Sequence, residues 1–147
     1  MKELKFHYIS AKNFMCFGPE GMEMHFNDFG RIVQVIGQNF DVPKVGDHIA
    51  SNGAGKSSIH DVISFGLYGK TVKKPNKLKG GQIANTKIGK KCEVEVQFDN
   101  YRIVRSLSPS KLEIWESPDR LWDKSTNVTK GTMAQTQEWI DDKIGLS

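Results

Sequence analysis

The sequence predicts a single α/β domain, an α+β arrangement in which antiparallel strands and one buried strand form a mixed sheet followed by a helix. Three observations predict this class. The β-branched run Arg31 to Ile36 is typical of a central strand. Apolar residues recur at helical spacing from Ile59 to Leu67 and leave His60 and Asp61 on another face of the helix. Stretches of alternating polarity on both sides indicate antiparallel strands, and 147 residues suit one domain.

The first residues predict two short strands joined by a turn. Lys5 to Ala11 alternates, with Phe6 and Tyr8 on one face. Met22 to Phe26 alternates apolar residues with Glu and His. Between them, Gly18 to Gly21 contains the Gly and Pro residues of a turn. The chain is therefore expected to begin with an antiparallel pair.

A glycine-rich loop joins the β-branched run to the helix. Its core, residues 51–58, reads Ser-Asn-Gly-Ala-Gly-Lys-Ser-Ser. Glycines let backbone N–H groups wrap around a phosphate, and the positive end of the new helix favours the anion. In such a loop Lys56 contacts the β- and γ-phosphates and Ser57 offers its hydroxyl to Mg²⁺. The loop therefore predicts ATP and Mg²⁺ as cofactors, Lys56 as the catalytic residue and Ser57 as the metal ligand.

The phosphate-loop pattern is interrupted, because G-x-x-x-x-G-K-[ST] requires glycine where the sequence has Ala50. When residues 40–52 are set aside as an insertion, Gly37 to Asn39 continue into Gly53 and complete the pattern. The predicted nucleotide-binding residues are Gly37, Gln38, Asn39, Asn52, Gly53, Ala54, Gly55, Lys56, Ser57 and Ser58. Pro and Gly in the insertion indicate a surface excursion. Three roles stay open for it: a lid over the nucleotide, a partner contact or an inert loop.

A lysine-rich segment follows the helix. Residues 69–81 show neither a helical nor a strand period and predict a basic loop. Its lysines are Lys70, Lys73, Lys74, Lys77 and Lys79. A solvated loop and a DNA-contacting surface both fit this cluster, because lysines neutralise phosphates without reading base sequence.

Two hairpins and a final helix are predicted beyond the basic loop. Glu93 to Phe98 and Tyr101 to Arg105 alternate around the turn Asp99-Asn100, and Lys111 to Glu116 is expected to pair with Arg120 to Trp122.

The last element is a helix over about residues 132–144. Thr132 can cap it with Gln135 as the capping-box partner, and Gly145 suits the position after its end. The residues expected to share one face are Met133, Gln137, Ile140 and Ile144.

The amino-acid composition limits the classes of function that are compatible with this chain. The net charge of +4, from 21 Lys+Arg and 17 Asp+Glu, is compatible with a polyanionic partner without requiring one. No apolar run approaches the roughly 20 residues of a membrane span, and the N-terminus lacks the apolar segment of a signal peptide. We therefore expect a cytoplasmic protein with no membrane partner. Cys16 and Cys92 are expected to be buried free thiols, and the four histidines form no ligand pattern.

Several segments together carry a family resemblance. They are, in chain order, residues 9–14 (Ile-Ser-Ala-Lys-Asn-Phe), 36–39, 52–58, 61–69, 82–85, 93–98 and 144–147. With these segments the chain resembles the N-terminal part of the ATPase head in the SMC/SbcC class of ABC-type ATPases, in a phage-like version. Members of this class are the motor subunits of recombination and double-strand-break repair nucleases. The position after the Asn13-Phe14 pair, which often carries a cation in the family, is Met15 here.

The resemblance implies that residues 1–147 form the first lobe of a composite ATPase. In the family two heads sandwich two ATP molecules, and hydrolysis needs a Walker B acidic pair, a signature motif and a Q-loop glutamine, none of which we find in this sequence. The implied partners are the C-terminal lobe of the same head, a second head in a homodimer, an SbcD-type nuclease subunit and DNA. On this basis the chain is expected to bind ATP weakly and to hydrolyse little.

Two other functions stay open. A self-contained P-loop phosphotransferase would need an acidic base and a phosphate-clamping Arg pair, for which only Arg102 and Arg105 are candidates. A nucleotide-independent binding module with a vestigial P-loop is less compatible with the retention of both Lys56 and Ser57.

Overall fold

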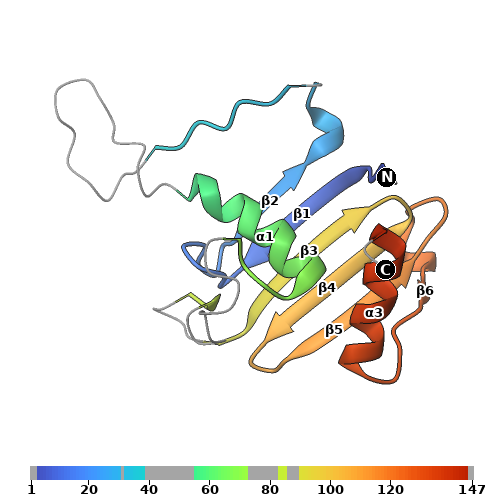
Figure 1. Ribbon diagram of the computed structural model, residues 1–147. Helices are drawn as coiled ribbons and strands as arrows, with labels where there is room; N and C mark the ends of the chain where they lie inside the picture. Colours follow the sequence, from blue (N-terminus) through green and yellow to red (C-terminus); the bar gives the residue numbers. More distant parts are fainter. Residues whose placement is uncertain (1–2, 31, 39–54, 73–82, 86–89, 146–147) are drawn as a thin grey trace, which may run out of the picture.

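The computed structural model describes residues 3–30, 32–38, 55–72, 83–85 and 90–145, and these form one antiparallel sheet covered on one face by two helices (Figure 1). The sheet has six strands in the order β2-β1-β3-β4-β5-β6. Their bounds are β1 Phe6–Lys12, β2 Met22–His25, β3 Cys92–Phe98, β4 Tyr101–Leu107, β5 Lys111–Glu116 and β6 Thr126–Asn127. Every neighbouring pair is antiparallel.

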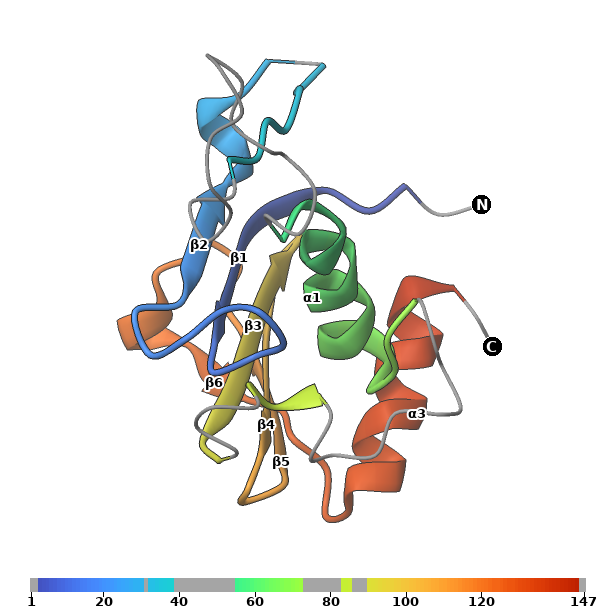
Figure 2. The same cartoon turned by 90° about the vertical axis from the view of Figure 1, so that its left-hand side faces the viewer.

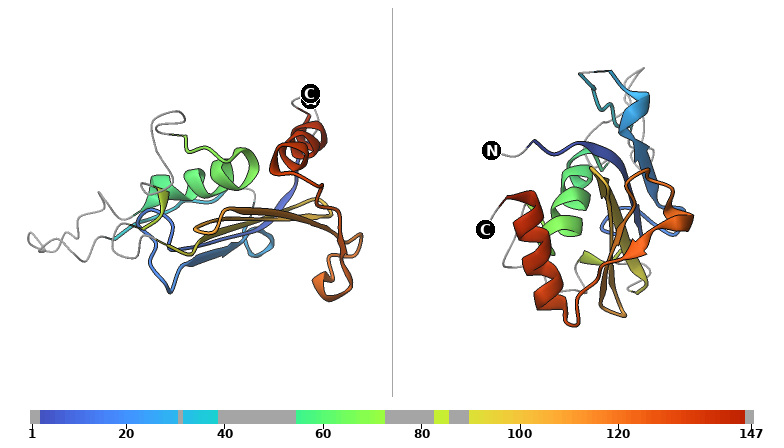
Figure 3. Two further views of the ribbon diagram at one scale, coloured as in Figure 1. Left: turned by 90° about the horizontal axis from the view of Figure 1, so that it is seen from below. Right: turned by 90° about the vertical axis from the view of Figure 1, so that its right-hand side faces the viewer.

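The two helices, α1 Lys56–Tyr68 and α3 Met133–Ile144, lie on the same face of the sheet (Figures 2 and 3). Short 3₁₀ turns occupy Phe26–Asp28 (η1) and Trp122–Lys124 (η2). The α/β class and its antiparallel strands, predicted from alternation and helical spacing, are confirmed.

The core lies between the sheet and α1. Val62 and Phe65 of α1 are buried against Val94 and Val96 of β3, and a Cβ added at Gly66 would collide with the Val96 side chain. Glycine at position 66 therefore lets α1 approach the sheet closely. Burial of this kind stabilises a fold by about 25 cal/mol for each Å² of apolar surface removed from water. Contacts made by the middle of α1 thus fix the helix on the sheet. Its first turn lies at the edge of the sheet.

Helix α3 has the predicted caps but a different buried face. Gln135 N–H donates to Thr132 Oγ1 at 3.2 Å, and Gly145 ends the helix with a left-handed φ of 80°. Thr136, Ile140 and Ile144 face the core, while Met133 is 46% exposed. The local capping signals placed the helix ends, but Met133, the first residue of the helix, does not share the buried face.

The strand predicted for the β-branched run is wrong within the described residues. Residues 32–38 have no regular secondary structure, and Ile32 and Ile36 are 93% and 75% exposed. A central strand needs a hydrogen-bonded neighbour on each side, and the described sheet offers this segment none. The run therefore has the sequence of a buried strand but lies apart from the sheet (Figure 1).

Three smaller predictions are also wrong. Arg120 to Trp122 does not pair with β5, because the Ser117 hydroxyl donates to Asp119 Oδ1 at 2.8 Å and holds a turn that leads into η2. Asp61 was expected away from the apolar face of the helix but is fully buried, and its Oδ1 accepts from Val72 N–H at 2.7 Å. Cys16 is exposed, whereas Cys92 is buried as predicted.

Candidate nucleotide-binding site

The site begins where the glycine-rich loop enters α1. Gly55 is the N-cap, with φ 81° and ψ 5°, a left-handed conformation that glycine adopts without steric cost. Ser58 N–H donates to Gly55 C=O at 3.0 Å and closes the first turn. This turn contains Lys56, Ser57 and Ser58 and no acidic residue. The first N–H groups of a helix lack intrahelical acceptors and carry a partial positive charge, so this turn suits an anion.

Lys56 and Ser57 border a cavity of about 350 Å³ beside the first turn. Its remaining lining residues are Val35, Ile59, His60 and Val72. Val35, which lies two residues before Gly37 in the sequence, thus borders the same cavity as Lys56 and Ser57. The walls away from Lys56 and Ser57 are largely apolar, and Val72 is 60% exposed.

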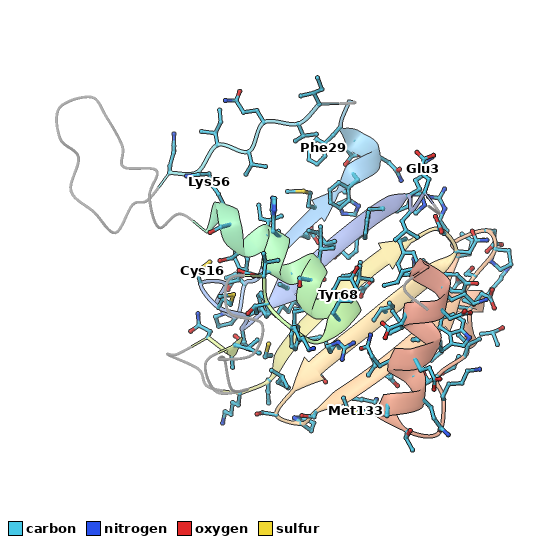
Figure 4. The ribbon with its side chains drawn as sticks, in the orientation of Figure 1. Glu3, Cys16, Phe29, Lys56, Tyr68 and Met133 are labelled. Atoms are coloured by element: carbon cyan, nitrogen blue, oxygen red, sulfur yellow. The ribbon has the colours of Figure 1, made fainter. Side chains whose placement is uncertain are left out.

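A loop between β1 and β2 forms a wall against the start of α1. In this segment, residues 13–18, which we call the β1 exit loop, Phe14 is fully buried and its ring centroid lies 5.4 Å from that of Phe65 in α1. A Cβ added at Gly55 would lie 2.8 Å from Cys16 Sγ and 3.4 Å from the Phe17 ring. Figure 4 shows Cys16 and Lys56 near the same end of α1. The β1 exit loop therefore touches the last residue of the glycine-rich loop.

The opposite end of α1 is closed by protein groups. Arg105 is only 6% exposed, and its Nε donates to Gly66 C=O at 3.2 Å. Gln137 Nε2 donates to Leu67 C=O at 2.8 Å, and Gln137 Oε1 accepts from Arg105 at 2.5 Å. Burial lowers the pKa of Arg105 to about 10, and the charge of Asp141 opposes this shift. A cation at the C-terminal end of a helix is favourable, and here it also satisfies terminal carbonyls.

The predicted site residues fall into three groups. Gly55, Lys56, Ser57 and Ser58 lie together at the first turn of α1. Gly37 is half-buried and Gln38 exposed in the segment without regular structure. Asn39, Asn52, Gly53, Ala54 and the insertion lie outside the described residues.

Of the lysines in the predicted basic loop, Lys70 is exposed just after α1, and Lys73, Lys74, Lys77 and Lys79 lie outside the described residues. Nearby, Lys90 and Lys91 precede β3 and are also exposed.

A second and larger cavity, of about 610 Å³, lies on the face of the sheet away from the helices. Across it Arg120 Nη1 donates to His7 Nδ1 at 2.9 Å, which requires His7 to accept at this nitrogen. Arg102 pairs with Glu95 at 3.0 Å, and Glu23 and Asp119 add further carboxylates. These carboxylates make the cavity a poor phosphate site, in contrast to the first turn of α1.

Sequence reasoning missed the two groups of residues that hold α1 in place. The β1 exit loop was noticed only as part of a resemblance, and nothing in Met15 signals its left-handed φ of 49°. Arg105 was considered only as a phosphate clamp. Ile103 and Val104 precede Arg105 on a strand whose side chains alternate between the two faces of the sheet. This alternation was the available signal, because it places the Arg105 side chain on the same face as that of Ile103.

Among the residues that the structure describes, no helix is long and apolar enough to cross a membrane. The same residues contain no group of three or more His, Cys, Asp or Glu side chains that could hold a metal ion.

Two phage proteins and one solved structure are similar to this chain. It is 28% identical over 131 residues to exonuclease subunit 2 of Enterobacteria phage T4, an alignment that covers 86% of this chain and 20% of that protein. It is 27% identical over 151 aligned positions to exonuclease subunit 2 of Escherichia phage RB69, covering 100% of this chain and 23% of that protein. The chain thus spans about a fifth of the length of the curated relatives it matches.

The solved structure comes from work on ATP-driven dimerization and DNA-stimulated activation of SMC ATPases. It superimposes with a TM-score of 0.56 at 16% identity and covers 97% of this chain and 81% of the solved chain. The fold is therefore that of an SMC ATPase head, as predicted. The model of the AAA domain family matches residues 8–147. AAA ATPase domains bind nucleotide, and with nearly its whole length matched this chain belongs to the AAA domain family.

Proposed function

We propose that this chain is the ATP-binding N-terminal lobe of an SMC-type ATPase head. The first turn of α1 carries the proposal, because Gly55 starts the helix in a left-handed conformation and Lys56, Ser57 and Ser58 follow without an acidic neighbour. The N–H groups of this turn bind the phosphates, and Lys56 neutralises the β- and γ-phosphates. Ser57, an exposed hydroxyl in the same turn, fits the single protein ligand that a P-loop gives to Mg²⁺. The bound Mg²⁺ supplies charge neutralisation between the phosphates.

The chain binds the nucleotide but leaves the catalytic set incomplete. Asp61, the first acidic residue of α1, is fully buried and hydrogen-bonded to Val72 N–H, so it is not placed to orient a water at the first turn. The Walker B, signature and Q-loop groups that an SMC-type head needs come from other parts of the complete head and from a second head. Turnover by residues 1–147 alone is therefore low.

The exposed β-branched run supports a C-terminal lobe as partner. Ile32 and Ile36 are 93% and 75% exposed, and Val35 lines the apolar cavity beside α1. Burying such side chains releases about 1.5–3 kcal/mol each. Strands of the C-terminal lobe beside residues 31–36 would give the run the neighbours that its sequence requires and would cover this cavity.

A nuclease subunit and DNA are the proposed partners of the complete protein. The support is the similarity to two phage proteins named exonuclease subunit 2. DNA contact would use the lysines at 70, 73, 74, 77 and 79, and Lys90 and Lys91 follow them in the sequence. Replacing these five lysines by Gln in the complete protein is expected to make the fall of log affinity with log salt concentration less steep, by about 0.9 for each lost phosphate contact. An unchanged slope would exclude this surface.

Titration of the chain with Mg²⁺-ATP by calorimetry tests the nucleotide site. Lys56→Ala removes a charge-assisted hydrogen bond, so the affinity is expected to fall about 10- to 100-fold. Lys111→Ala is the matched control, because Lys111 pairs with Glu113 at 2.9 Å on β5, away from α1. No binding by the wild type would favour a nucleotide-independent module. Substantial phosphate release by the chain alone would favour a self-contained phosphotransferase.

A further inference from the structure

We propose that Asn85 is a positioning residue for the phosphate site, which holds the β1 exit loop against Gly55 and so fixes the start of α1. The proposal rests on the nucleotide-binding function proposed above. Asn85 is not part of the phosphate-loop pattern. It belongs to the short described segment Ile83–Asn85 between α1 and β3, and it acts on the site through the β1 exit loop.

Asn85 makes hydrogen bonds to several backbone groups of the β1 exit loop. Its Nδ2 donates to Met15 C=O at 2.9 Å and to Phe17 C=O at 3.4 Å. Its own N–H donates to Asn13 C=O at 2.7 Å, and the neighbouring Ile83 C=O accepts from Met15 N–H at 2.7 Å. One amide side chain thus hydrogen-bonds two carbonyls of the loop.

The β1 exit loop needs such external support because of its backbone. Asn13 and Met15 have left-handed φ values of 50° and 49°. Asparagine tolerates this region, but for the long side chain of Met15 it is uncommon and unfavourable. Left-handed residues of this kind persist where the surroundings fix them. The amide of Asn85 and the carbonyl of Ile83 bind the two peptide groups on either side of Met15 and supply that fixation.

The supported loop meets the phosphate site at Gly55. Cys16 Sγ lies 2.8 Å and the Phe17 ring 3.4 Å from the position that a Cβ of residue 55 would take, so both lie directly beside the Gly55 backbone. Phe17 is itself the residue whose carbonyl accepts from Asn85. Gly55 C=O accepts the first hydrogen bond of α1, from Ser58 N–H. If the β1 exit loop shifts, Gly55 loses these contacts. The conformation of Gly55 sets the direction of the first N–H groups of the helix, so these groups would then be less well fixed.

Asn85→Ala and Asn85→Asp test this role, with Asn127→Ala as the control. The side chain of Asn127 also hydrogen-bonds the backbone, accepting from Thr129 N–H at 2.9 Å, but it lies on the edge strand β6. Asn85→Asp keeps the size of the side chain and replaces the donating NH₂ by an oxygen. Both Asn85 variants are expected to bind Mg²⁺-ATP about 10-fold more weakly, the effect of losing one or two hydrogen bonds. Asn127→Ala is expected to keep wild-type affinity.

Amide hydrogen exchange separates positioning from general stability and does not depend on nucleotide binding. In both Asn85 variants exchange is expected to rise about 10-fold at residues 58–60, whose N–H groups make the first hydrogen bonds of α1, and to stay unchanged at residues 62–67. A uniform rise across α1 and β3 would show a merely structural role and overturn the proposal, as would wild-type exchange at residues 58–60. If the wild type fails to bind Mg²⁺-ATP, the proposed function is wrong, while the exchange result still decides the role of Asn85. Wild-type affinity in Asn85→Ala, together with binding by the wild type, would also overturn the proposal.

Discussion

The two ends of α1 are treated differently by the rest of the molecule. At the C-terminal end, Arg105 and Gln137 hydrogen-bond the carbonyls of Gly66 and Leu67, so protein groups satisfy the terminal acceptors. At the N-terminal end, Gly55 makes no side-chain capping bond, and the first turn has no carboxylate to offset its positive charge.

This difference fits the proposed nucleotide site. A helix end needs polar partners, which protein groups supply at the C-terminal end of α1 and which a bound phosphate would supply at the first turn. A ligand at the first turn would meet a helix whose other end is already held by Arg105, which lowers the cost of ordering the site on binding.

Arg105→Ala is expected to have the largest effect on this arrangement. The change leaves the buried Gly66 carbonyl of α1 without its donor and removes packing against Phe65, so the free energy of unfolding should fall by about 3 kcal/mol. Urea unfolding measures it. Arg102→Ala is the control, because Arg102 is partly exposed in its pair with Glu95 and should cost less than about 1 kcal/mol. Equal losses in the two variants would contradict the distinction.

Gly55→Ala is expected to have a smaller effect on stability. Alanine at a φ of 81° costs about 1 kcal/mol, and its Cβ would meet Cys16 Sγ. The free energy of unfolding should fall by about 1–2 kcal/mol, and Mg²⁺-ATP affinity should fall with it. Adding Cys16→Ala should recover part of the loss by removing the collision. Gly131→Ala, which meets only Gln135 Oε1 at 3.5 Å, serves as the control; no difference between the two glycines would argue against a strained N-cap.

The two thiols give the smallest and most local test. Cys16 is exposed beside Gly55, whereas burial raises the pKa of Cys92 to about 11, so near neutral pH only Cys16 should react with iodoacetamide. Mg²⁺-ATP is expected to slow this reaction a few-fold, as measured by mass spectrometry of the labelled peptides. An unchanged rate at saturating nucleotide would place the ligand away from this wall.

The thiol shift also sets a pH dependence. In the folded chain Cys92 keeps its proton up to about pH 11, whereas the unfolded thiol loses it near its ordinary value of 9.0. The folded state therefore binds more protons between these pH values, and the stability from Cys92 is lost as pH rises from 9 to 11. Replacing Cys92 by Ala should reduce the change of the free energy of unfolding, measured in urea, between pH 9 and 11. The same pH dependence in the variant would show that other groups cause it.

Local signals in the sequence were sufficient for the parts of the fold that depend on neighbouring residues. The caps Thr132 and Gly145 and the glycine before Lys56 placed the helix ends, because capping involves residues within one turn. The β-branched run was misleading, since a strand also needs a neighbour that the described residues do not provide. Sequence alone could not identify Asp61 as buried, because Val72 reaches it from beyond the helix end.

The candidate site was predictable only in its first turn. Lys56 and Ser57 are recognisable by pattern, but the groups that support them come from distant strands and loops. Asn85 binds the β1 exit loop across 70 residues of sequence, and Arg105 reaches α1 across 39. No periodicity or motif reports such contacts, so they appear only when the chain is folded.

Hydrogen exchange along α1 with and without Mg²⁺-ATP tests the central claim most directly. The account predicts slower exchange at residues 55–58 when the nucleotide binds and unchanged exchange at residues 66–70, where Arg105 and Gln137 already hold the helix end. Protection confined to the outer face of the sheet around His7 and Arg120, or none at residues 55–58 at saturating nucleotide, would contradict it.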